Sequence, residues 1–74
     1  MNESTRREID FAVFLIYRLA ESWGKTVPET YRTLADLNVL GDYVIPFYDV
    51  LHTQGEQCLV DEITELARRR GAVI

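Results

Sequence analysis

Cysteine and histidine are almost absent, with only Cys58 and His52 among 74 residues. One cysteine cannot form an intramolecular disulfide, and with one histidine it cannot supply the ligands of a structural zinc site. We therefore expect no metal and no cofactor, and the lone thiol suits the reducing cytoplasm. A core of this size supplies roughly 3–5 kcal/mol. Good helix packing, self-association or a protein partner must add to it.

Basic residues are also few, since 8 Lys and Arg stand against 12 Asp and Glu, for a formal net charge of −4. An acidic domain repels a phosphate backbone unless its basic residues cluster. The two clusters have simpler explanations. Arg6-Arg7 can form ion pairs on a helix surface, and Arg68-Arg69-Arg70 suits the C-terminal end of a helix. We therefore expect no nucleic acid among the partners.

Long apolar runs are missing too. The longest covers residues 11–17, whereas a helix that spans a bilayer needs about 20 residues. Glu8 and Asp10 precede this run and no small-residue cleavage site follows it, which argues against a signal peptide. We expect a cytoplasmic protein without a membrane partner.

Helix start signals are frequent in place of these features. A threonine followed three positions later by a glutamate can form a capping box, in which each side chain satisfies a backbone amide of the first turn. Three such pairs each open an amphipathic stretch: Thr5 with Glu8, Thr26 with Glu29, and Thr53 with Glu56. We expect all three pairs to cap helices.

Stop signals agree with these starts. Gly24, Gly41 and Gly71 each follow a periodic apolar segment, where a glycine can end a helix in the left-handed conformation. No segment alternates with a period of two over a useful length, so no strand is predicted.

The sequence thus predicts an all-α fold in one domain, residues 1–74, as a compact bundle of three longer helices and one short helix. The helices are expected at about 6–23, 27–38, 43–52 and 54–70. Pro46 falls inside the third. That helix therefore starts either near Asp42 with one hydrogen bond lost, or at Pro46 itself.

Apolar residues at helical spacing define the expected core faces. These are Ile9, Ala12, Val13, Ile16, Leu19, Ala20 and Trp23 in the first helix, Val27, Tyr31, Leu34 and Leu37 in the second, and Leu59, Val60, Ile63, Leu66 and Ala67 in the last. Cys58, in the first turns of the last helix, is expected to be buried as a small apolar residue.

The segment from Asp42 to Gly55 carries a Tyr-x-x-Leu-His-Thr-Gln pattern, made by Tyr48, Leu51, His52, Thr53 and Gln54. It resembles the signature of a family of small bacterial proteins of unknown function, and the resemblance covers almost the whole chain. Members are often encoded beside a second uncharacterised family that resembles ADP-ribosyltransferases. The resemblance implies an enzyme–inhibitor or toxin–antitoxin pair with this chain as the neutralising partner. It assigns no role to any residue.

His52 has two roles open at the junction of the last two helices. In the structural role, Thr53 and Glu56 cap the last helix. His52 then caps the final carbonyls of the preceding helix or donates to a nearby side chain, and Tyr48 packs one turn earlier. In the functional role, the ring of His52 and the amide of Gln54 contact a partner. Capping explains Thr53 and Glu56 without a further assumption, so we favour the structural role.

A catalytic role for this region is not expected. Asp49 and His52 are three residues apart, which can bring a carboxylate near an imidazole, but a dyad also needs a nucleophile or a metal. The only thiol, Cys58, is expected in the core. We therefore predict no catalytic residue and no enzyme activity.

The first helix carries more apolar residues than one core face needs. Phe14 lies opposite the core stripe, between Asp10 and Arg18, with Phe11 and Tyr17 on its flanks. A contiguous apolar patch of this kind marks an interface. The alternative is that the other helices cover the first helix on both sides. Because full enclosure is demanding in so short a chain, we interpret the band as an interface.

The sequence therefore predicts a non-enzymatic protein-interaction module. Its candidate partner-binding residues are Phe11, Phe14, Tyr17, Arg18, Tyr48, His52 and Gln54. The alternative is a homo-oligomeric structural or scaffold protein, in which the same band makes a two-fold contact. A DNA-binding regulator would need a basic recognition helix, and a small hydrolase would need an accessible nucleophile. The sequence predicts neither.

Overall fold

The computed structural model describes residues 2–74, and this range holds helices and no strand, which confirms the all-α prediction. Helix α1 spans Glu3–Trp23 and α2 spans Val27–Asp36. A π-helical turn, η1, spans Leu40–Val44, the short helix α3 spans Tyr48–Leu51, and α4 spans Glu56–Arg69.

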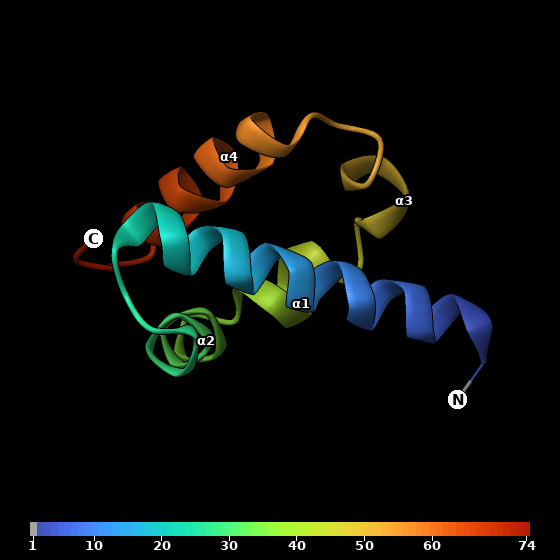
Figure 1. The fold of residues 1–74 in the computed structure, drawn as a ribbon, viewed down its shortest axis with the longest axis horizontal. Helices are drawn as coiled ribbons and strands as arrows, with labels where there is room; N and C mark the ends of the chain where they lie inside the picture. The colour runs from blue at the N-terminus through green and yellow to red at the C-terminus, as the bar shows by residue number, and fades with distance from the viewer. Residues whose placement is uncertain (1) are drawn as a thin grey trace.

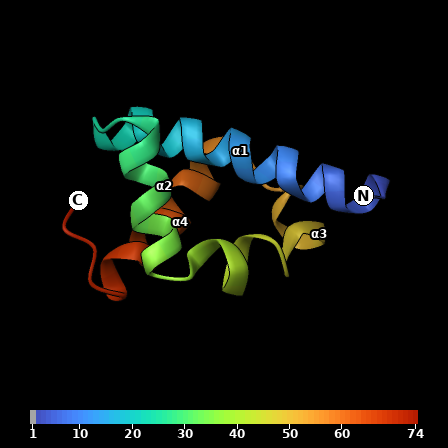
Figure 2. The same ribbon diagram turned by 90° about the horizontal axis from the view of Figure 1, so that it is seen from below.

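Helix α1 is the axis on which the other elements pack (Figure 1). Its 21 residues, at about 1.5 Å each, nearly match the longest dimension of 34 Å. Helix α2 crosses α1 at a steep angle near the C-terminal end of α1, and α4 packs on another side of α1 (Figures 1 and 2). The N-terminal turns of α1 project beyond every other element in both views.

The core lies where α1, α2, η1 and α4 meet, and α3 also contributes to it. The largest fully buried side chains are Leu15, Leu19, Thr30, Leu34, Val39, Val44, Leu51, Leu59 and Ile63. In α4 the predicted core face is confirmed, because Leu59, Val60, Ile63 and Ala67 are buried and Leu66 is half-buried. None of the helices within residues 2–74 is both long and apolar enough to cross a membrane.

The buried face of α1 is rotated from the predicted stripe. Leu15, which was not assigned to the stripe, is fully buried, whereas Ile9 and Val13 are 40% and 45% exposed. Each residue advances about 100° around a helix. Val13 therefore lies about 120° around the helix from Leu19, which is at the centre of the buried face. Ala12, Ile16, Leu19 and Ala20 are buried as predicted, and Trp23 is half-buried.

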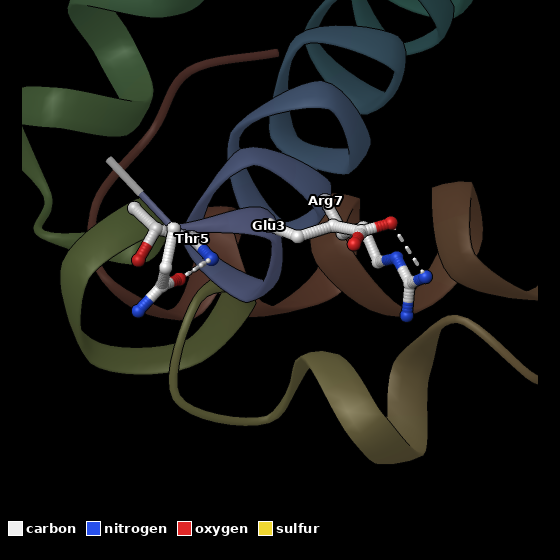
Figure 3. Close-up of polar contacts among 4 residues, drawn as sticks. Glu3, Thr5 and Arg7 are labelled. Carbon is white, nitrogen blue, oxygen red and sulfur yellow. Dashed lines mark hydrogen bonds and ion pairs between the residues drawn. The ribbon is translucent and has the colours of Figure 1, made fainter.

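Asn2, not Thr5, caps α1. The side-chain oxygen of Asn2 accepts a hydrogen bond from the Thr5 amide at 2.8 Å (Figure 3), so the helix starts at Glu3 and the predicted box of Thr5 with Glu8 is wrong. The guanidinium of Arg7 donates to Glu3 at 2.9 Å. This pair, four residues apart, is the kind expected on an exposed helix face. At the other end, Gly24 closes the helix with a φ of 65°, as predicted.

The capping box at the start of α2 is confirmed. The Thr26 hydroxyl accepts from the Glu29 amide at 3.2 Å, and the Glu29 carboxylate accepts from the Thr26 amide at 3.0 Å. The buried face of the helix differs from the prediction, since Thr30 is fully buried and Tyr31 is 53% exposed. The Thr30 hydroxyl is satisfied because it donates to the Thr26 carbonyl at 2.9 Å.

This box leads to a pH-dependent prediction. The hydrogen bonds from the Thr26 amide and hydroxyl hold the pKa of Glu29 below its ordinary value. A lowered carboxyl pKa contributes stability above the unfolded-state pKa, and this contribution is lost as pH falls through the folded-state pKa. Thr26→Ala removes the N-cap hydroxyl, and at neutral pH this should lower the free energy of unfolding by about 1 kcal/mol, the ordinary cost of losing such a cap. Urea titrations should give a smaller loss in acid.

The matched control for this experiment is Thr5→Ala, which changes an exposed threonine at the start of α1 that does not cap it. We expect its effect to stay within about 0.5 kcal/mol. Equal losses for Thr5→Ala and Thr26→Ala would contradict the assignment of the two caps.

The predicted third helix is two separate pieces. Pro46 has no N–H to donate, so the hydrogen-bond ladder breaks there. Before the break, the Ile45 amide donates to the Leu40 carbonyl at 3.0 Å, five residues back, which makes a π turn. The helix resumes only at Tyr48, so both predicted starts were wrong. Gly41 lies inside η1 and ends no helix. Asn38, with a φ of 58°, makes the left-handed turn after α2, which ends at Asp36.

Helix α4 begins later than predicted and without a side-chain cap. Gly55 is its N-cap, and the Thr53 hydroxyl instead donates to the Val50 carbonyl at 2.8 Å, so the predicted box of Thr53 with Glu56 is wrong. At the far end, Gly71 turns the chain with a φ of 108°. Arg70 donates to the Leu37 carbonyl at 2.9 Å, which ties the C-terminal ends of α2 and α4 together.

Candidate protein-binding surface

Three of the predicted binding residues form a row of rings that joins α1 to α3. The ring of Phe11 meets that of Tyr48 edge to face, with centroids 5.3 Å apart and an interplanar angle of 77°. The ring of Tyr48 stacks on that of His52, at 4.6 Å and 10°. Both geometries are favourable for aromatic pairs, so the row fixes the position of α3 on α1.

The ring of His52 is held by the backbone of α3. Its Nδ1 atom lies 2.8 Å from the Tyr48 carbonyl oxygen. A carbonyl can only accept, so Nδ1 is the donor in this hydrogen bond. Tyr48 is the first residue of α3, and its carbonyl also accepts from the His52 amide at 2.9 Å. The ring is thus held by α3, but the predicted capping of the final carbonyls of that helix stays a prediction. The hydrogen bond of the ring goes to the Tyr48 carbonyl and not to the carboxylate of Asp49.

Arg18 links α1 to the start of α4. Its Nε atom is shielded from solvent and contacts Oε1 of Glu56 as a charge pair without the geometry of an aligned hydrogen bond. Its Nη1 atom lies 3.2 Å from Oε1 of Glu21. The side chains of Arg18 and Glu56 remain 38% and 44% exposed, so the pair contributes at most about 1 kcal/mol. The sequence did not indicate this contact of Glu56.

Phe14 lies on the same flank of α1 as Phe11 and Arg18, because they are three and four residues away along the helix. Its side chain is 43% exposed. Gln54 is half-buried, and its Oε1 atom accepts from the thiol of Cys58 at 3.8 Å. Cys58 itself is exposed, so the prediction that it is buried was wrong.

Phe11 and Tyr48 join α1 to α3, and Arg18 and Glu56 join α1 to the start of α4. Phe14 and Gln54 lie within four residues of these contacts along the chain. Six of the predicted binding residues therefore belong to this region. We call them the junction surface: Phe11, Phe14, Arg18, Tyr48, His52 and Gln54.

The seventh, Tyr17, is 59% exposed and lies about 120° around α1 from Phe11. It is in line with Ile9 and Val13 at a spacing of four residues, and we call these three residues the outer ridge. Tyr17 is also three residues from Phe14, so the junction surface and the outer ridge adjoin at Phe14 and Tyr17. The predicted band of Phe11, Phe14 and Tyr17 therefore stays a prediction.

The junction surface lies within the part of the chain that matches a known family. Residues 10–70 match the family described as Protein of unknown function (DUF3791). The chain belongs to that family. No curated protein and no solved structure matches it.

A concave region of this DUF3791 chain lies between η1 and α4, with a volume of about 400 Å³. It is lined by Tyr43, Asp61, Glu62, Glu65, Leu66 and Arg69. The Tyr43 hydroxyl donates to Glu62 at 3.4 Å, and burial together with the Glu62 charge raises the pKa of Tyr43. Across residues 2–74, no three His, Cys, Asp or Glu side chains lie close enough to hold a metal ion.

Proposed function

We propose that this protein is a non-enzymatic interaction module that binds a cognate protein through the junction surface. The observation that carries the proposal is the fixed row of Phe11, Tyr48 and His52 beside a half-exposed Phe14. Aromatic and arginine side chains dominate binding energy in protein interfaces. Because the row and Arg18 are already held by contacts within the chain, a partner would order few side chains on binding.

The proposal includes the chemistry of the partner. We propose an ADP-ribosyltransferase-like enzyme, which this chain neutralises in the cytoplasm. The support is the resemblance to a family whose members are often encoded beside such proteins, and an exposed single thiol that suits a reducing compartment.

The non-enzymatic part is supported by where the two most reactive side chains point. The ring of His52 donates to the Tyr48 carbonyl, and the thiol of Cys58 donates to the amide oxygen of Gln54. A nucleophilic pair would instead need the thiol and the ring within hydrogen-bond reach of each other.

Capture from the native host tests the proposal. The tagged wild-type chain should retain one stoichiometric partner, and Phe14→Glu should lose it by roughly tenfold or more, as expected for a charge in an apolar hot spot. Val13→Glu is the matched control, because Val13 is equally exposed but lies on the outer ridge. The captured protein, once purified, should be an ADP-ribosyltransferase-like enzyme that the chain inhibits. Retention of the partner by Phe14→Glu would remove the junction surface from the proposal.

A second candidate function is a homo-oligomeric scaffold, and the exposed outer ridge favours it. Sedimentation separates the two candidates, because a scaffold associates with itself in the absence of any other protein.

A further inference from the structure

The outer ridge is a row of apolar side chains that no part of residues 2–74 covers. Ile9, Val13 and Tyr17 are 40%, 45% and 59% exposed and follow one another every four residues along α1. Charged, exposed residues border one edge of the ridge: Arg6, Asp10 and Glu21. A single exposed apolar residue needs no explanation, but a row along three turns does.

We propose that the outer ridge binds the same ridge of a second copy of this chain, with the two α1 helices antiparallel and Val13 on the two-fold axis. The contact centres on Val13, whereas the proposed partner site centres on Phe11 and Tyr48, so different substitutions test the two. They adjoin at Glu21, which pairs with Arg18 within the chain. The proposal gives a specific geometry to the self-association that the scaffold alternative requires.

The register follows from the spacing of the apolar residues. With Val13 opposite itself, Ile9 comes level with Tyr17 of the other copy, since each lies four residues from the axis. The three residues then form one continuous apolar contact, with a valine pair at the centre and an isoleucine–tyrosine pair on each side. A two-fold contact of this kind is the commonest form of protein self-association.

The charges on the edge of the ridge fit this register. Arg6 lies seven residues before Val13 and Glu21 lies eight after it, so the two come level within about 1.5 Å along the antiparallel helices. Around the helix axis, Arg6 lies about 20° from Val13 and Glu21 about 80°, both in the same direction. When a two-fold axis relates two antiparallel helices, the same edge of each helix lies on the same side of the contact, so these two residues come side by side. Arg6 makes no ion pair within residues 2–74, so it is free to join Glu21 of the other copy.

The same register brings a second pair of polar groups together, Asp10 and the hydroxyl of Tyr17. Asp10 lies three residues before Val13 and Tyr17 four after it. In the antiparallel arrangement the phenol of Tyr17 can therefore donate to the carboxylate of Asp10 in the other copy. A parallel two-fold contact would instead set Arg6, which is only about 20° around from Val13, against Arg6 of the other copy. Like charges facing each other disfavour that arrangement.

The N-terminal part of this contact is open. The N-terminal turns of α1, which carry Arg6, project past the other elements of their own copy (Figures 1 and 2). A contact made by one ridge of one helix lies at the low end of interface sizes, below about 1,200 Å². We expect a reversible dimer that depends on protein concentration.

Disulfide trapping tests the register. In a Cys58→Ser background, which removes the exposed native thiol, Val13→Cys should oxidise to a covalent dimer roughly tenfold faster than Phe14→Cys. The reason is that a disulfide needs Cβ atoms about 3.5–4.5 Å apart, which only residues on the axis satisfy. Phe14 is the matched control because its exposure, 43%, is close to the 45% of Val13. Equal rates, or a faster Phe14→Cys, would overturn the proposal.

Sedimentation over a wide concentration range gives a second readout. The Cys58→Ser chain should form a reversible dimer, Arg6→Glu should weaken it by roughly tenfold, and Arg6→Glu with Glu21→Arg should restore it. A monomer at every concentration overturns the proposal, and a dimer that the double exchange does not restore overturns the antiparallel register. Neither result affects the capture experiment with Phe14→Glu, so the two proposals fail separately.

Discussion

Replacing Leu15 by alanine should leave most of this protein unfolded at physiological temperature. Leu15 is fully buried in the core cluster with Leu19 and Leu34. A buried leucine-to-alanine change costs about 2–5 kcal/mol, because it removes apolar contacts and leaves a cavity. A domain of this size has roughly 3–5 kcal/mol in its core, so the loss approaches the whole. Thermal unfolding followed by circular dichroism should show a broad transition or none.

The matched control is Ile9→Ala in the same helix. Ile9 is 40% exposed, so we expect a loss below about 1 kcal/mol. A comparable loss of stability for both variants would mean that Ile9 is buried and that the core face of α1 is the one predicted from the sequence. That result would also remove the outer ridge.

Leu15 and Ile9 show that the spacing of apolar residues could not decide which face of α1 is buried. The run from Phe11 to Tyr17 is apolar around most of the helix, so the spacing fits more than one stripe. The buried face is chosen by the positions of α2 and α4, which pack over Leu15 and Leu19. Where one side of a helix is clearly polar, as in α4, the sequence predicted the buried residues correctly.

Helix starts show the same limit at a local scale. The threonine–glutamate pattern occurs three times, and only Thr26 with Glu29 forms a capping box. Thr5 fails because Asn2, three residues earlier, already caps α1. Thr53 fails because its hydroxyl takes the Val50 carbonyl at the end of α3. A four-residue pattern alone does not determine which residue becomes the N-cap, because that also depends on the residues before it.

The candidate site was predictable only where its contacts are local. Tyr48 and His52 are four residues apart, and their stacking follows from helical spacing. The contacts of Phe11 with Tyr48 and of Arg18 with Glu56 join residues far apart in the chain. They need the chain to come back to α1 after the turn at residues 45–47, which separates η1 from α3. Nothing in the spacing of these residues indicates that turn.

Replacing Tyr48 by alanine should lower the free energy of unfolding by about 2–3 kcal/mol. The change removes the edge contact with Phe11 and the stack on His52, each worth about 0.5–1.5 kcal/mol beyond the area that is buried. Tyr48→Phe is the control, because it keeps both ring contacts and the hydroxyl of Tyr48 makes no hydrogen bond within residues 2–74. We expect its effect to stay within about 0.5 kcal/mol. Urea titration measures both.

The effect should also be local, because α3 has only four residues and so short a helix cannot persist by itself. Besides the ring row, only Leu51 anchors it in the core. Tyr48→Ala should therefore speed hydrogen exchange at the amides of Leu51 and His52, while α4 stays protected, and it should abolish capture of the partner that Tyr48→Phe retains. If the α3 amides stay protected in Tyr48→Ala, Leu51 alone fixes the helix. The ring row would then not be what holds the junction surface in a binding-ready form.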